Sequence, residues 1–215
     1  MSERVTVVDY GIGNVYSVCN ALRRIGAVPE LTGDPAAIAG AERLILPGVG
    51  AFSQAMDNLR ADRIDAAIAR FLESGRPFLG ICIGMQVLME SSTEFGDHAG
   101  LGLIPGKVTR IPGTASDGAA LTVPHVGWAE IHPARDPGVG PLALPGDDPG
   151  GRHFYFVHSY MARPADPAHL LATARYGGHE ITAAVGRDNM LGLQFHPERS
   201  GPAGLALLAR FVRNG

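Results

Sequence analysis

Residues 77–84, Pro-Phe-Leu-Gly-Ile-Cys-Ile-Gly, decide the fold of this chain. The apolar run from Pro77 to Ile81 predicts a buried strand, and the stretch from Ile83 to Glu90 predicts the helix that follows it. Between them lies Cys82, with a glycine two residues before it and another two residues after it. This spacing is the pattern of a nucleophile elbow, a sharp strand-to-helix turn that bulkier neighbours would crowd. The stretch therefore predicts a strand–helix unit with a candidate nucleophile at its junction.

The sequence before this stretch alternates in the same way between apolar runs and helical periodicity. The predicted strands are Val5–Val8 and Arg43–Leu46, the latter stopped by Pro47-Gly48, and the predicted helices run from Asn14 to Ile25, from Phe52 to Leu59 and from Asp62 to Leu72. Gly26 follows the first helix as a stop signal. Strands that alternate with helices imply βαβ units and a parallel sheet.

The second half of the chain has a different pattern. Short β-like runs dominate residues 107–131 and 153–194, and include Phe154–Val157, Leu170–Tyr176, Ile181–Val185 and Met190–Phe195. Asp117-Gly118 predicts a tight turn, His132–Gly151 a surface loop, and Ala203–Val212 a last helix. We therefore expect an α/β fold: a mostly parallel central sheet flanked by helices, with an additional antiparallel β portion in the second half. Residues 1–215 are expected to form a single domain.

Composition excludes several classes of function. The 215 residues carry a net charge of −3 and no block of lysine and arginine, which argues against a nucleic-acid or anionic-membrane surface. No run approaches the roughly 20 apolar residues of a membrane span, and the first residues lack a signal-peptide core. The two cysteines give no disulfide framework, so we expect a cytoplasmic protein.

A candidate base lies far downstream of the candidate nucleophile. His196-Pro197-Glu198 follows an apolar run, and a carboxylate two residues after a histidine can orient its ring. A helix N-terminus would favour the Cys82 thiolate. The alternatives are a buried structural cysteine, as we expect for Cys19, and a histidine and glutamate with no catalytic role. No ligand pattern supports a metal, even with His153 or His158 added, so neither a metal nor a cofactor is expected.

Two glycine-containing turns follow the first two predicted strands. Pro47-Gly48-Val49-Gly50 could direct backbone N–H groups toward an oxyanion, or could be an ordinary strand-to-helix turn. Asp9-Tyr10-Gly11-Ile12-Gly13-Asn14 begins like a dinucleotide-binding loop, but Tyr16 stands where the third glycine belongs, so a Rossmann cofactor site is not expected.

Six motifs in order along the chain carry a resemblance to a known family. They are Val8–Asn14, Leu46–Phe52, Gly80–Gln86, Pro124–Trp128, Phe154–Tyr160 and Gln194–Glu198. With them the chain resembles the class I glutamine amidotransferases, and among these the glutaminase subunits of imidazole glycerol phosphate synthase. The Cys82 and His196–Glu198 blocks are typical of the whole family, whereas the blocks Asp9–Asn14, Pro47–Phe52 and Pro124–Trp128 point to this subunit.

The resemblance implies a role for each matching position. Cys82 would be the nucleophile, His196 the base and Glu198 its orienting carboxylate; Gly48, Val49 and Gly50 would form an oxyanion strand that needs a backbone change for activity; Gln86, Glu94, Ser159 and Tyr160 would hold glutamine; and Asn14, Pro124, Trp128 and Arg199 would face a partner. Arg199 stands where the family usually has lysine, and Ile83 where leucine is usual. The stretch from Gly113 to Ala120 is longer than the family pattern.

The implied activity is hydrolysis of glutamine to glutamate and ammonia. The ammonia would pass to a barrel-shaped cyclase subunit, in a heterodimer, for histidine biosynthesis. Two alternatives stay open: a glutaminase that serves anthranilate, purine or pyridoxal phosphate synthesis, and a catalytically silent binding subunit.

Overall fold

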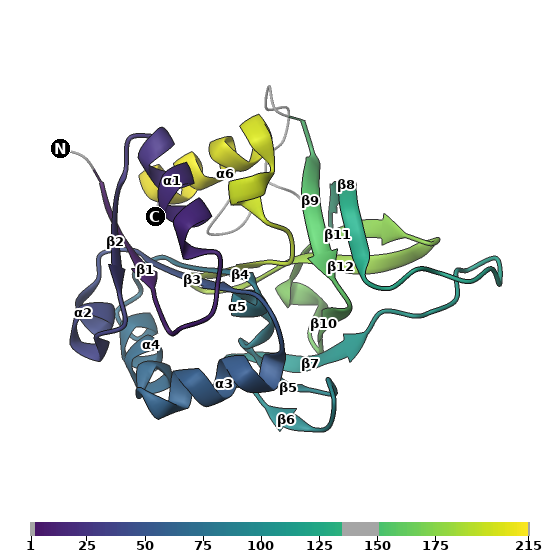
Figure 1. The fold of residues 1–215 in the computed structure, drawn as a ribbon, viewed down its shortest axis with the longest axis horizontal. Helices are drawn as coiled ribbons and strands as arrows, with labels where there is room; N and C mark the ends of the chain where they lie inside the picture. The colour runs from purple at the N-terminus through teal and green to yellow at the C-terminus, as the bar shows by residue number, and fades with distance from the viewer. Residues whose placement is uncertain (1–2, 135–150, 215) are drawn as a thin grey trace.

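The structure is a computed structural model that describes residues 3–134 and 151–214. Within these residues a nine-stranded sheet runs through the middle of the molecule (Figure 1). In their order across the sheet, the strands are β2 (Val28–Thr32), β1 (Arg4–Val8), β3 (Leu44–Gly48), β4 (Phe78–Cys82), β13 (Met190–Leu193), β12 (His179–Arg187), β11 (Leu170–Tyr176), β8 (His125–Pro133) and β9 (His153–His158).

The sheet has a parallel part and an antiparallel part, as the sequence predicts. Strands β2, β1, β3, β4 and β13 pair in parallel, whereas β13, β12, β11, β8 and β9 pair antiparallel. Strand β13 comes from near the end of the chain, yet it lies directly beside β4. Because β3, β4 and β13 are parallel neighbours, their carboxyl ends meet at one edge, where open α/β sheets place their ligand sites.

Helices cover both faces of the parallel part. Helices α1 (Val15–Arg24) and α6 (Gly201–Asn214) lie on one side of the sheet, and α3 (Phe52–Ala61) and α4 (Ile64–Leu72) lie on the other (Figure 1). The short α2 (Pro35–Gly40) packs against α4, and α5 (Ile83–Gln86) follows β4 directly. None of the helices in the described part of the chain is long and apolar enough to cross a membrane.

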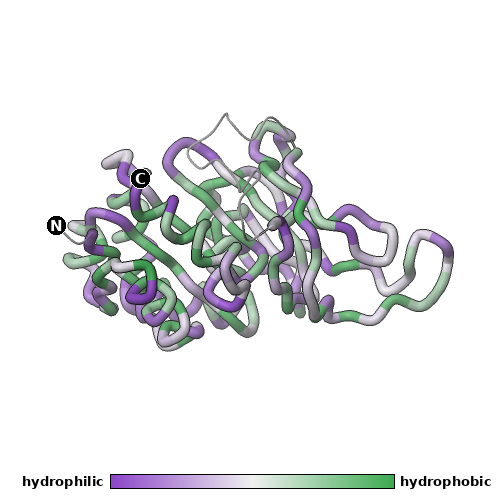
Figure 2. The backbone as a smooth tube through the Cα atoms, turned by 90° about the horizontal axis from the view of Figure 1, so that it is seen from above, coloured by the Kyte–Doolittle hydropathy of each residue, from purple (hydrophilic) through white to green (hydrophobic). Residues whose placement is uncertain are grey.

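The core lies where strands are covered on both faces. Every residue of β3 and of β4 is buried, which is the continuous apolar pattern of parallel strands between two helix layers. Figure 2 shows hydrophobic backbone concentrated through the centre and hydrophilic segments mainly at turns and outer surfaces. The fully buried aromatic side chains include Phe52, Phe71, Phe78, Phe154, Phe156, Phe195 and Phe211.

A second, four-stranded sheet includes residues that were predicted to be helical. It consists of β10 (Tyr160–Pro164), β7 (Ile104–Arg110), β5 (Met89–Ser92) and β6 (His98–Ala99). The helix predicted from Ile83 to Glu90 was wrong in length, because it ends at Gln86 and Met89 already belongs to β5. The backbone N–H groups of Leu103 and Ile104 both donate to the Leu88 carbonyl at 2.9 Å. Pairing with distant segments therefore overrides the local helical preference.

Other predicted boundaries hold or shift slightly. Gly26 follows α1 with a φ of +85°, as a helix stop requires, and Asp117-Gly118 forms a turn in which Gly118 N donates to Ala115 O at 3.0 Å. The predicted surface loop His132–Gly151 was wrong at its start, because β8 continues to Pro133 to pair with β11. Residues 135–150 of that loop lie outside the described residues. Strand β2 and helix α2 were not predicted from the sequence.

Candidate active site

Cys82 lies on a strained turn between β4 and α5. Its φ and ψ are 55° and −110°, a conformation rarely adopted by a residue with a side chain. A Cβ on Gly80 would lie 2.4 Å from the Gly84 carbonyl oxygen, and one on Gly84 would lie 1.8 Å from the Leu46 carbonyl oxygen of β3. The two glycines are therefore required by close backbone approach, which confirms the elbow geometry predicted from the sequence. Because α5 has only four residues, its dipole stabilises the Cys82 thiolate less than the helix predicted from the sequence would.

His196 is held from both ends just beyond β13. Its Nδ1 lies 2.8 Å from Oε1 of Glu198, whose side chain is 1% exposed. Its backbone N–H donates to the Tyr155 carbonyl at 2.9 Å, and its carbonyl accepts from the Ser200 hydroxyl at 2.6 Å. Because the Glu198 carboxylate can only accept, Nδ1 of His196 carries a proton and donates it in this hydrogen bond. Nε2 is then the ring nitrogen that can take up or release a proton. Nε2 is buried and has no hydrogen-bond partner among the described residues.

The pKa of His196 reflects its neighbours. Burial alone lowers the pKa, but interactions with Cys82 and with Glu198 outweigh burial and raise the pKa of His196 to about 10. Cys82 contributes to this shift, although Nε2 of His196 makes no hydrogen bond of regular geometry within the described residues. When these two neighbours carry charge, the imidazole keeps its proton at neutral pH.

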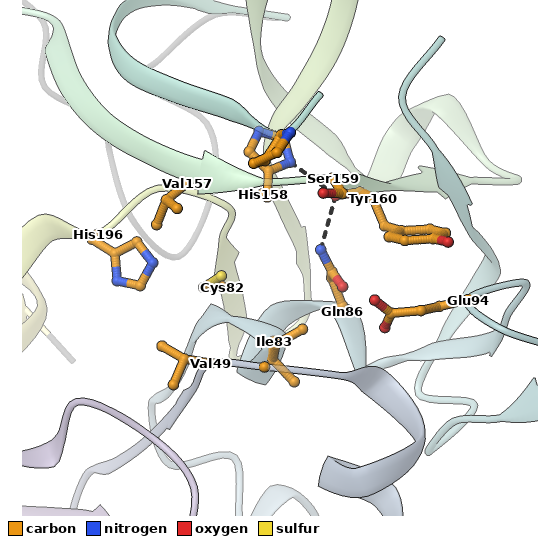
Figure 3. A pocket seen from close by; sticks show the side chains of 12 residues that line it. Val49, Cys82, Ile83, Gln86, Glu94, Val157, His158, Ser159, Tyr160 and His196 are labelled. Carbon is orange, nitrogen blue, oxygen red and sulfur yellow. Dashed lines mark hydrogen bonds between the residues drawn. The ribbon is translucent and has the colours of Figure 1, made fainter. Parts of the chain in front are cut away.

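Cys82 and His196 line one cavity of about 290 Å³ at the carboxyl edge of the sheet (Figure 3). The structure brings most of the predicted site residues together here: Val49, Gly50, Cys82, Gln86, Glu94, Ser159, Tyr160 and His196 all line the cavity, as does Pro124. Three further lining residues, Ile83, Val157 and His158, were not predicted as site residues. Glu198 lies behind His196 rather than in the wall.

Gln86 is fixed by two hydrogen bonds from one amide nitrogen. Its Nε2 donates to the Tyr160 carbonyl and to Oε1 of Gln194, each at 3.0 Å (Figure 3 shows the Tyr160 bond). Its Oε1 is buried without a partner among the described residues, so it is available as an acceptor. Gln194 itself was missed as a site residue, although a polar residue inside an otherwise apolar run was a signal for it.

Glu94 has a structural contact as well as a place in the cavity wall. Its Oε2 accepts the backbone N–H of Phe52, the first residue of α3, at 2.7 Å. Because the cap residue Ala51 has no side-chain acceptor, Glu94 satisfies this helix end from 42 residues away. That the other carboxylate oxygen of Glu94 binds a ligand in the cavity stays a prediction.

A pair of buried histidines supports the wall opposite α5. The Nδ1 of His158 donates to the Tyr160 carbonyl at 2.8 Å, which leaves its Nε2 to accept from Nδ1 of His125 at 3.3 Å. Burial lowers the pKa of His158 to about 3 and that of His125 to about 4, so both rings are neutral at ordinary pH. The sequence motif Phe154–Tyr160 was singled out, but this pairing across β8 and β9 was not.

The candidate oxyanion segment follows β3. Gly48 lies opposite Cys82 in the β3–β4 register, and Gly50 has a φ of +92°. A Cβ on Gly48 would lie 2.6 Å from the Tyr10 hydroxyl oxygen, which is buried and unpartnered within the described chain. Burial, and then the charge of Cys82, raise the pKa of Tyr10 well above its usual value. That these residues stabilise an oxyanion stays a prediction.

Comparison with known proteins decides the family. The family model described as "Glutamine amidotransferase class-I" matches residues 6–214, which is nearly the whole chain. The chain belongs to the class-I glutamine amidotransferases.

Two curated relatives of the chain carry the same name. The imidazole glycerol phosphate synthase subunit HisH of Syntrophotalea carbinolica is 46% identical over 208 residues, covering 96% of this chain and 98% of the relative. The subunit HisH of Synechococcus elongatus is 44% identical over 211 residues, covering 98% and 93%. This amidotransferase therefore falls among the HisH-type members of its family.

Solved structures agree on the fold. A chain from the structure of PurLQS from Thermotoga maritima superposes with a TM-score of 0.71 at 22% identity, covering 98% of both chains. A chain described as a glutamine amidotransferase superposes with a TM-score of 0.69 at 19% identity, covering 95% of this chain and 96% of that one. At these identities the likeness supports the class-I amidotransferase fold alone.

Three of the four predicted partner-facing residues of this amidotransferase are exposed, and Asn14 is half-buried. Trp128 is 57% exposed and makes an edge contact with the Tyr155 ring, centroid to centroid 6.2 Å. The Arg199 guanidinium carbon lies 5.1 Å from the same ring centroid. Pro124 is exposed, and Asn14 caps α1 without a side-chain hydrogen bond to it. Their contact with a partner stays a prediction.

Proposed function

We propose that this chain is the glutaminase subunit of imidazole glycerol phosphate synthase, with Cys82, His196 and Glu198 as its catalytic triad. The observation that carries the proposal is the cavity that Cys82 and His196 both line, with Glu198 behind the histidine. The elbow that presents Cys82, and the relatives named as subunits of this synthase, support it.

The chemistry follows from the protonation of the pair. The Cys82 thiolate attacks the side-chain amide carbon of glutamine, and the amide oxygen becomes an oxyanion. The His196 imidazolium, whose pKa is raised to about 10, donates its Nε2 proton to the amide nitrogen. The carbon–nitrogen bond breaks, ammonia leaves, and a γ-glutamyl thioester remains on Cys82.

Hydrolysis of the thioester closes the cycle. His196 is now neutral and takes a proton from water, whose oxygen attacks the thioester carbon. The carbon–sulfur bond breaks, glutamate leaves, and the Cys82 thiolate with its imidazolium partner is restored. Backbone N–H groups of Gly48, Val49 and Gly50 are the proposed donors to the oxyanion in both steps.

The cavity offers acceptors that suit the amino-acid end of glutamine. Gln86 and Glu94 both line it, and the Gln86 oxygen, which has no partner among the described residues, and the Glu94 carboxylate can accept from an ammonium group. Ser159 and Tyr160 form the facing wall. A cavity of about 290 Å³ is of a size for a small amino acid rather than for a nucleotide or a peptide.

Ammonia is proposed to pass to a cyclase subunit in a heterodimer, in the cytoplasm. The docking face would contain Asn14, Pro124, Trp128 and Arg199. Exposed Tyr16 and Val126 add apolar area next to Asn14 and Trp128 in the sequence, and aromatic and arginine side chains are typical of interface centres.

A coupled assay tests the proposal. The purified chain is given glutamine, with and without the cyclase and the cyclase substrate, and glutamate release is measured. We expect low activity alone and strong stimulation by the loaded cyclase.

Stimulation by an anthranilate, purine or pyridoxal phosphate synthase, with none from the cyclase, would rule out this assignment. Cys82→Ala should abolish hydrolysis and keep partner binding; retained hydrolysis would refute the nucleophile, and a wild type that only binds would indicate a silent subunit.

A further inference from the structure

Gln194 is a fully buried polar side chain that the proposed triad does not use. It follows β13 and precedes His196 by two residues, and its backbone N–H donates to the Ala183 carbonyl at 2.9 Å. Its exposed fraction is 0%, so its amide must find partners inside the protein. Both ends of the amide are directed at residues of the cavity.

The amide nitrogen of Gln194 faces the nucleophile. Its Nε2 lies 3.7 Å from Sγ of Cys82, within the range of an N–H···S hydrogen bond. A thiol sulfur accepts weakly, whereas a thiolate carries the charge that strengthens such a bond. The contact therefore stabilises the anion more than the neutral thiol.

The amide oxygen of Gln194 faces Gln86. Its Oε1 accepts one proton of the Gln86 amide at 3.0 Å, and the Tyr160 carbonyl accepts the other at the same distance. With both protons engaged, the Gln86 amide cannot rotate by 180° without losing both bonds. Its oxygen is then the atom without a partner among the described residues, on a side chain that lines the cavity (Figure 3).

The orientation of the two amides is mutually determined. If Gln194 were turned over, its nitrogen would face the Gln86 nitrogen and its oxygen would face the sulfur. Two donors would then oppose each other, and a lone pair would oppose the thiolate. Only the observed arrangement satisfies all three groups.

We propose that Gln194 is a positioning residue that links the nucleophile to the glutamine-binding amide. One end donates an N–H to Cys82 Sγ and favours its ionised form, and the other end locks Gln86 with its oxygen toward the substrate's N–H groups. The inference rests on the proposed function for its substrate, but its first half concerns only the Cys82 thiol.

Alkylation of Cys82 tests the first half without any turnover. Iodoacetamide reacts with the thiolate, which forms the sulfur–carbon bond as iodide leaves, so the rate against pH reports the fraction of thiolate. Mass spectrometry of the Cys82 peptide separates this reaction from that of Cys19, which is buried on α1. The assay uses the full chain without partner or glutamine.

Gln194→Met keeps the bulk of the side chain and removes both polar ends. The midpoint of the alkylation profile should rise by about one pH unit, which is about a tenfold slower reaction below the midpoint. Gln86→Met removes the partner of the Gln194 oxygen but leaves the Gln194 nitrogen opposite Sγ, where the thiolate charge still favours a donor, so the midpoint should rise by clearly less than in Gln194→Met while glutamine KM rises about tenfold. The KM of Gln194→Met should rise as well.

The midpoints of the alkylation profiles decide the proposal. An unchanged midpoint in a folded Gln194→Met protein overturns it, as does an equal shift in Gln86→Met. If Gln194→Met does not fold by circular dichroism, Gln194→Asn, which withdraws the amide by one methylene, must show the upward shift. A wild type without glutaminase activity would refute the proposed function, yet the midpoint shift would still decide the Gln194–Cys82 contact.

Discussion

Gly84→Ala places a methyl group where the elbow meets the central sheet. Its Cβ would lie 1.8 Å from the Leu46 carbonyl oxygen and 2.9 Å from the Leu46 carbonyl carbon. Carbon and oxygen without a bond between them normally stay more than about 3 Å apart, so one backbone must move by about 1 Å or more. Neither backbone can move without a large cost in free energy. Leu46 lies in β3, which is hydrogen-bonded to a strand on each side, and Gly84 continues the strained turn of Cys82.

The expected cost lies at or above the upper end for overpacking, about 3 kcal/mol. For a chain of this length, each kcal/mol lowers the melting temperature by about 2–4 °C, so the loss should be about 6–12 °C. Glutaminase activity of the cyclase complex, measured well below the melting temperature, should fall at least about tenfold, because Cys82 and Gly48 move relative to each other.

Gly40→Ala is the matched control. Gly40 ends α2 without a positive φ, and a Cβ there would meet nothing within 4 Å. Its melting temperature should be unchanged or slightly raised, since alanine favours a helix over glycine. Thermal unfolding followed by circular dichroism compares the two variants. A Gly84→Ala protein that melts and turns over like Gly40→Ala would refute the claim that close backbone approach dictates the glycine.

Three further predictions concern the cavity and the docking face. Glu94→Gln keeps an acceptor for the helix N–H but loses the charge, so glutamine KM should rise about 10- to 100-fold with the melting temperature nearly constant; an unchanged KM would count against Glu94 as a ligand for the ammonium group. The pKa of His196 is raised from 6.5 to about 10, so its stabilising effect is complete below about pH 6.5 and disappears as the pH rises through about 10. Glu198→Gln should flatten this dependence in urea unfolding at several pH values; the same slope in both proteins would exclude Glu198 as a cause. Trp128→Ala should weaken cyclase binding about tenfold or more by calorimetry, whereas Leu31→Ala, an exposed residue on the opposite edge strand, should not; equal affinities would place the docking face elsewhere.

The parts of the fold that depend on local sequence could be predicted. A predicted strand, two glycines and a predicted helix start were enough to predict the elbow at Cys82. As expected, a side chain on either glycine would clash with the neighbouring backbone. Strand β11 was predicted with its observed bounds, because its apolar run is bounded by turn residues. Strand β2 was missed because it lies at the edge, is half-exposed and contains Pro29, all of which weaken the pattern.

The parts that depend on distant pairing could not be predicted from a local pattern. That β13 lies beside β4, and so brings His196 to the cavity of Cys82, is a property of sheet order. The switch from α5 to β5 follows from hydrogen bonds to residues 101–104, which no helix propensity encodes. The contact of Gln194 with Cys82 spans 112 positions and appears only when β13 takes its place.

The placement of functional residues came mainly from the family resemblance. Glu94, Ser159 and Tyr160 carry no local signal of their own, yet all three line the cavity. The bond from Glu94 to the start of α3 gives that carboxylate a second, structural task that sequence spacing did not reveal. That residues 1–215 form one domain stays a prediction.

Covalent trapping tests the central claim most directly. The chain, alone and with the loaded cyclase, is incubated with a chloromethyl ketone analogue of glutamine, and its peptides are mapped by mass spectrometry. One adduct should form on Cys82, glutamine should protect against it, and His196→Ala should slow it strongly, while Cys19 stays unmodified. Labelling of Cys19 in preference to Cys82, or undiminished labelling of Cys82 in His196→Ala, would contradict a thiolate at position 82 that shares its proton with His196.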